Sequence, residues 1–120
     1  KLPASIKWEE FLDNAKDALA ASHIRHTKPI SKKVQTIAVC GGSGSFLLKD
    51  AISKKADIFV TSDFKYHEFF EADGKIMILD VGHYESEWRT CNIIANRIKE
   101  KFTNFAVHLA SANTNPVQTR

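Results

Sequence analysis

The middle of the chain repeats one pattern three times: a short apolar stretch, a polar or glycine-rich turn, and a segment with helical spacing. The apolar stretches are Thr36–Cys40, Asp57–Thr61 and Lys75–Val81. The helical segments are Phe46–Ser53, about Lys65–Glu71, and a long helix with a stripe of Cys91, Ile94, Ala95, Ile98 and Phe102. Short apolar runs between turn residues are typical of buried strands, and the stripe predicts a buried helix face.

The two ends of the chain add weaker patterns. Apolar residues recur at helical spacing at Trp8, Phe11, Leu12, Ala15 and Leu19. We therefore expect a first helix that is capped by Ser5 and runs to about Ala20. A short strand is expected within His23–Thr27. Alternation of Phe105, Val107 and Leu109 predicts a closing strand.

Strands that alternate with helices and read as nearly continuous apolar runs are typical of a mainly parallel sheet with helices on both faces. We therefore predict an α/β fold, as a single domain over residues 1–120. Right-handed crossovers place all three strand-to-helix turns at the carboxyl edge of the sheet, where such sheets bind ligands. The polar residues of the turns at 40–45, 61–67 and 80–87 are expected to meet there.

The composition indicates a soluble protein of the cytoplasm. The 120 residues are 43% hydrophobic, which suits one core. The 17 basic and 14 acidic residues are spread along the chain, so a nucleic-acid partner is not expected. No apolar run approaches the roughly 18 to 20 residues of a membrane span, and two distant cysteines favour reduced thiols. The start at Lys1, beside a Leu2-Pro3 turn signal, is typical of a domain excised from a longer protein.

The pair His83 and Glu87 forms the first candidate site. His83 follows a predicted strand and Glu87 lies four residues later, so both side chains can face one point above the sheet edge. An imidazole and a carboxylate suit zinc, manganese or iron, but these ions require three or four ligands. The alternative is a histidine packed at a turn and a glutamate that complements the helix dipole.

The neighbouring turn repeats this spacing with Asp63 and His67. Lys65 and Tyr66 stand beside them and carry donors for an anionic or polar substrate. The alternative is that Asp63 is an ordinary helix N-cap and His67 a surface residue.

The segment Gly41-Gly42-Ser43-Gly44-Ser45 lies between a strand and a helix. Backbone N–H groups there, together with the helix N-terminus, can hold a phosphate. The segment lacks the lysine of a Walker motif and the third glycine of a dinucleotide fingerprint. A tight structural turn is the open alternative.

Taken together, four segments resemble the C-terminal part of the NIF-three-like family, whose members are homologues of GTP cyclohydrolase I type 2. The segments are Val39–Ser45, Thr61–His67, Gly82–Glu87 and Asn113–Val117. The resemblance covers nearly the whole chain, in the order and spacing of the family. It implies that the chain is one lobe of a larger fold.

The resemblance also implies a site for two divalent metal ions, to which this part supplies a histidine and a glutamate. These correspond to His83 and Glu87. The other ligands belong to an N-terminal part that this chain lacks, so its metal site is expected to be incomplete. The family further implies a ring-shaped homo-oligomer.

For the full-length protein the resemblance implies hydrolysis of a small-molecule substrate, possibly a nucleotide. Asp63 or His67 would then transfer protons, and the glycine segment with Lys65 would bind the substrate or its phosphate. The competing interpretation is a non-enzymatic, metal-containing binding or regulatory module. Polar groups that converge at the sheet edge favour a catalytic function over the non-enzymatic module.

Overall fold

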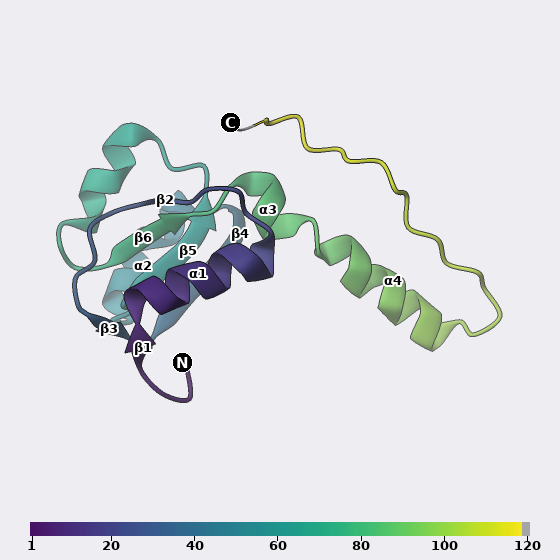
Figure 1. Ribbon diagram of the computed structural model, residues 1–120, viewed down its shortest axis with the longest axis horizontal. Helices are drawn as coiled ribbons and strands as arrows, with labels where there is room; N and C mark the ends of the chain where they lie inside the picture. Colours follow the sequence, from purple (N-terminus) through teal and green to yellow (C-terminus); the bar gives the residue numbers. More distant parts are fainter. Residues whose placement is uncertain (119–120) are drawn as a thin grey trace. The chain divides into compact units, whose positions relative to one another are not determined.

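A four-stranded sheet organises the first of two units in the computed structural model, which describes residues 1–118. The units are Lys1–Ser86 and the part from Glu87 onward. The strands are β2 (Arg25–His26), β6 (Met77–Asp80), β5 (Ile58–Ser62) and β4 (Ile37–Ser43), in that order across the sheet (Figure 1). The strands β4, β5 and β6 are parallel, and β2 pairs with β6 antiparallel. The predicted α/β class with a mainly parallel sheet is confirmed.

The two central strands are apolar because both of their faces are covered. Every residue of β5 and β6 is buried. Successive side chains point to opposite faces, so Ile58 and Val60 contribute to one core cluster while Phe59 contributes to the other. The register pairs Thr61 with Asp80, so β5 and β6 end at nearly the same level.

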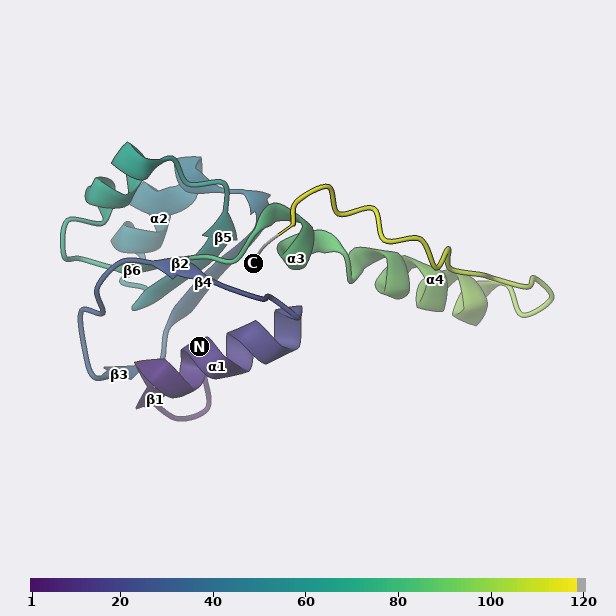
Figure 2. The same cartoon turned by 45° about the horizontal axis from the view of Figure 1, so that its top comes forward.

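Helices cover both faces of this sheet, as the sequence predicts. The helix α1 (Trp8–Leu19) packs its apolar side chains against the cluster that contains Ile58 and Leu79. The opposite cluster, around Phe59 and Ile78, is covered by η1 (Ser45–Leu47), α2 (Leu48–Ser53) and η2 (Tyr66–Ala72). Figure 2 shows α1 and α2 on opposite sides of the strands.

The start of α1 differs from the sequence prediction. Ser5 does not cap the helix, because the strand β1 (Ile6–Lys7) comes between them and Lys7 occupies the N-cap position. This strand pairs antiparallel with β3 (Lys33–Val34), in a register that sets Ile6 opposite the buried Val34. Pairing with a segment far along the chain therefore outweighs the local capping signal.

The second unit contains the helix α4 (Thr90–Lys101). Its predicted apolar stripe is present, but only Ala95 is buried, while Ile94 and Ile98 are 53% and 38% exposed. Periodicity indicates which face of a helix is apolar, and it does not say what covers that face. None of the helices within residues 1–118 has the length and apolar character that crossing a membrane demands.

The predicted closing strand is wrong. Residues 105–109 form neither a helix nor a strand in the structure. Alternation makes a segment suitable for one face of a sheet, but a strand also needs a neighbour that accepts its backbone hydrogen bonds.

Candidate metal centre

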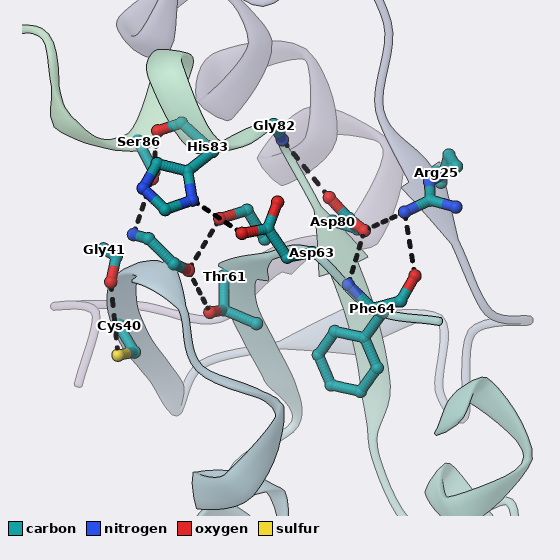
Figure 3. Close-up of polar contacts among 12 residues, drawn as sticks. Arg25, Cys40, Gly41, Thr61, Asp63, Phe64, Asp80, Gly82, His83 and Ser86 are labelled. Atoms are coloured by element: carbon teal, nitrogen blue, oxygen red, sulfur yellow. Dashed lines mark hydrogen bonds and ion pairs between the residues drawn. The ribbon is translucent and has the colours of Figure 1, made fainter. Parts of the chain in front are cut away.

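The three predicted turns meet at the carboxyl edge of the sheet. The Ser86 hydroxyl, from the helix α3 (His83–Glu87), accepts a hydrogen bond from the Gly42 backbone N–H at 2.8 Å. The Gly42 carbonyl in turn accepts hydrogen bonds from the hydroxyls of Thr61 at 3.0 Å and Ser62 at 2.6 Å. Figure 3 shows this network joining the ends of β4 and β5 to the start of α3. The prediction of one shared edge is confirmed.

At this edge Asp63 binds His83. The carboxylate Oδ2 of Asp63 lies 2.6 Å from Nδ1 of His83, and the two side chains are 45% and 53% exposed (Figure 3). A carboxylate oxygen can only accept here, so Nδ1–H of the imidazole is the donor. Asp63 has a positive φ of 61°, a conformation that aspartate tolerates better than most residues. The left-handed residue turns the chain sharply at the end of β5, where the Asp63 carboxylate meets the imidazole.

The sequence analysis grouped Asp63 with His67 as a second candidate pair. In the structure Asp63 instead contacts His83. His67 lies in η2 and is exposed, and within residues 1–118 no hydrogen bond joins it to Asp63. The alternative role of Asp63 as a helix cap is also wrong, because Lys65 is the N-cap of η2. Spacing along one helix could not reveal a contact between two different turns.

The Asp63–His83 pair suits a metal-binding histidine. Histidine ligands commonly donate one ring N–H to a carboxylate, which fixes the tautomer and orients the other nitrogen toward the ion. With Nδ1 bound to Asp63, Nε2 is the nitrogen through which His83 would bind a metal. Glu87 is the last residue of α3 and the first of the second unit. The described residues contain no group of three or more potential metal ligands.

Glu68 lies in the first turn of η2, near its N-cap residue Lys65 and near His67. The Glu68 carboxylate accepts the Lys65 backbone N–H at 2.6 Å and the Ser45 hydroxyl at 3.2 Å. These bonds, with the charges of Lys65 and His67, hold the pKa of the Glu68 carboxyl below its usual value, against a smaller raising effect of desolvation. Ionised Glu68 therefore links η2 to the end of the glycine segment.

Next to this link is a pocket of about 270 Å³, lined by Ser45, Phe46, Leu48, Lys49, Phe64, Glu68 and Glu71. Neither Asp63 nor His83 lines it. The candidate metal ligand therefore lies on the exposed sheet edge and outside this pocket.

The glycine segment is built into the fold more tightly than a phosphate-binding loop would be. Gly41, Gly42 and Ser43 belong to β4, and Gly42 has a φ of 64° where the register with β5 shifts. The Gly42 N–H is already bound to Ser86. Gly44 lies so close to β5 that a Cβ there would be 2.3 Å from Thr61 Oγ1. These contacts favour a structural role over a phosphate site, although most of the segment extends β4 rather than forming the expected turn.

The close approach of Gly44 can be tested by Gly44→Ala. The added methyl would overlap Thr61, which is fully buried and bonded to Gly42, so the neighbour cannot move freely. We expect a loss of about 1–3 kcal/mol in the free energy of unfolding, measured by urea denaturation. Ser43→Ala, at the exposed neighbouring position, should change it by less than about 0.5 kcal/mol. Equal losses in both variants would contradict the close packing.

Sequence reasoning missed Asp80 and Arg25. Asp80 ends β6 and is only 5% exposed, and its Oδ2 forms an ion pair with the Arg25 guanidinium from β2. The same Oδ2 accepts the Phe64 N–H at 3.0 Å, and Oδ1 accepts the Gly82 N–H at 3.3 Å (Figure 3). An acidic residue at the end of an otherwise apolar strand was the available signal.

Comparison with known proteins identifies the family. The sequence model of the family described as Duf34/NIF3 (NGG1p interacting factor 3) matches residues 1–116. The chain belongs to the Duf34/NIF3 family. This confirms the resemblance that the four motif segments indicate.

Curated relatives in this family are named GTP cyclohydrolase 1 type 2 homolog. The protein from Campylobacter jejuni is 37% identical over 97 residues, which cover 79% of this chain and 39% of the relative. The protein from Staphylococcus aureus is 30% identical over 115 residues, which cover 92% of this chain and 31% of the relative. The chain thus spans about a third of the length of the curated relatives it matches.

Solved structures of the family share the fold. Staphylococcus aureus protein SA1388 matches with a TM-score of 0.90 and 26% identity, covering 100% of this chain and 41% of that one. A Bacillus cereus protein related to NIF3 matches with a TM-score of 0.80 and 25% identity, covering 99% of this chain and 34% of that one.

Proposed function

We propose that this chain is part of a dinuclear metal-dependent hydrolase, to which it contributes His83 and Glu87 as metal ligands. The observation that carries the proposal is the 2.6 Å contact between Asp63 Oδ2 and His83 Nδ1. It gives His83 the carboxylate partner that is typical of metal-binding histidines. The alternative, a histidine that only packs at a turn, does not account for a partly exposed carboxylate that fixes the tautomer of His83.

Each residue has a distinct role in this proposal. When bound, two divalent ions supply Lewis-acid polarisation and an activated water. His83 and Glu87 would hold the ions jointly with ligands from the remainder of the protein, and Asp63 would orient His83. Proton transfer falls to His67 rather than Asp63, because the Asp63 carboxylate is engaged by His83. Homo-oligomeric assembly stays a prediction.

Hydrolysis is tested on the full-length protein by elemental analysis and then by a substrate screen. The screen should include guanosine triphosphate, because relatives carry the name GTP cyclohydrolase 1 type 2 homolog, along with phosphoesters and cyclic amides. We expect bound zinc, manganese or iron, and turnover that a chelator abolishes. Bound metal without turnover of any substrate class would favour the binding or regulatory module, and absence of metal would contradict both.

The isolated chain should bind divalent metal weakly, since it offers two ligands where a closed site uses about four. Calorimetric titration with zinc is expected to show a dissociation constant in the micromolar range or weaker. His83→Ala should weaken this residual binding further. Tight stoichiometric binding that His83→Ala leaves unchanged would show that other residues are the ligands.

A further inference from the structure

We infer that Asp80 is a positioning residue for His83, which it serves by holding together the two turns that carry the Asp63–His83 pair. The inference rests on the proposed metal site, because it explains how the ligand His83 is aimed. Within residues 1–118, Asp80 forms its hydrogen bonds with Arg25, Phe64 and Gly82 and with neither side chain of the pair. Its carboxylate acts through the backbone on either side of them.

The two oxygens of Asp80 bind one turn each. Oδ2 accepts the N–H of Phe64, the residue directly after Asp63, at 3.0 Å. Oδ1 accepts the N–H of Gly82, the residue directly before His83, at 3.3 Å. Figure 3 shows both bonds converging on Asp80 beside the Asp63–His83 contact. One side chain therefore sets the separation of the two backbone segments from which the pair is built.

Only a carboxylate can make this arrangement. Asp80 is 5% exposed, and its partners, including the Arg25 guanidinium, are all donors. Asparagine offers one accepting oxygen, and its NH₂ group would face a donor on the other side. A buried donor that loses its acceptor is costly, so the backbone on that side would move.

Arg25, from the edge strand β2, binds both Asp80 and the backbone of Phe64. Besides its ion pair with Asp80, it donates a hydrogen bond to the Phe64 carbonyl at 3.0 Å. Its guanidinium also lies 5.3 Å from the ring centre of Phe69. Phe64 is thus held at both its N–H and its C=O, directly after the strained residue Asp63.

A purely structural role for Asp80 can be separated from positioning by a matched control at the opposite edge of the sheet. Asp57, which precedes β5, uses one carboxylate oxygen to accept the N–H groups of Gln35 and Thr36, both at 2.8 Å. Because asparagine would keep that one accepting oxygen, the control is Asp57→Ala, which removes the acceptor of both N–H groups at the end of the sheet opposite His83. Asp80→Asn and Asp57→Ala should both lower the melting temperature.

The decisive measurement is the tautomer of His83 in the metal-free chain. Long-range ¹H–¹⁵N correlation spectra at about pH 8.5, where histidine is ordinarily neutral, distinguish Nδ1–H from Nε2–H. We expect Nδ1–H in the parent chain and in Asp57→Ala, and a clear shift toward Nε2–H in Asp80→Asn. If His83 in Asp80→Asn keeps the parent tautomer, Asp80 is structural only and the inference is wrong.

A second variant guards against loss of folding. Should Asp80→Asn not fold, Arg25→Gln changes a side chain that is 55% exposed and keeps the carboxylate. It should shift the same His83 signals in the same direction but less, and unchanged signals would overturn the inference.

In the full-length protein, Asp80→Asn should weaken metal affinity about 10–100-fold. Loss of the tautomer effect refutes positioning, whereas metal binding unaffected by His83→Ala refutes the proposed site, so the two failures are distinguishable.

Discussion

Glu87→Gln in the full-length protein is expected to release metal while the fold stays intact. The substitution keeps nearly the same size and shape but removes a negative charge. A carboxylate offsets part of the repulsion between two nearby dications, and an amide cannot. Glu87 is exposed at the end of α3 and belongs to neither core cluster, so folding does not depend on it. The measurement is elemental analysis beside circular dichroism and thermal melting.

Two further variants should lose less metal than Glu87→Gln. His67→Ala is the matched control, because His67 is exposed on η2 and should spare metal content while lowering turnover if it transfers protons. Asp63→Asn should weaken metal binding about 10–100-fold, since it removes the partner that orients His83. Retention of both metals and full activity in Glu87→Gln would contradict the two-metal assignment and favour the binding module.

Among the proposed variants, Phe59→Ala should cause the largest loss in the free energy of unfolding. Phe59 is 2% exposed at the centre of the sheet and meets Phe64 edge to face, with ring centres 6.3 Å apart. Truncation removes buried apolar area and leaves a cavity between β5 and the helices above it, which costs about 3–5 kcal/mol in the free energy of unfolding. Urea denaturation measures this loss.

The control for this prediction is Phe46→Ala, since Phe46 is 75% exposed. We expect its free energy of unfolding to change by less than about 0.5 kcal/mol. A loss below about 1 kcal/mol for Phe59→Ala would show that the core is less tightly packed around β5 than the structure indicates. Because Phe64 also binds Asp80 through its N–H, the Phe59→Ala chain is expected to loosen the sheet edge as well.

The sequence by itself determined the repeated order of strand, turn and helix around β4, β5 and β6 and the edge at which their turns meet, but it predicted neither β1 nor β3. Apolar runs and helical spacing are local patterns, and the handedness of parallel crossovers converts them into topology. His83 and Asp63 could therefore be placed at one edge, and the family could be identified from the motifs there.

Only the tertiary structure decided which polar groups touch. Asp63 and His83 are 20 residues apart, Phe64 and Asp80 are 16 apart, and Arg25 and Asp80 are 55 apart. Such pairs depend on strand register and on backbone angles such as the positive φ of Asp63, which no local periodicity encodes. The same reason explains why Ser5 lost its capping role to the pairing of Ile6 with Val34, and why the stripe on α4 did not reveal what covers it. Local spacing indicates what a segment can do, and the long-range partners that fold around it decide which of those options it takes.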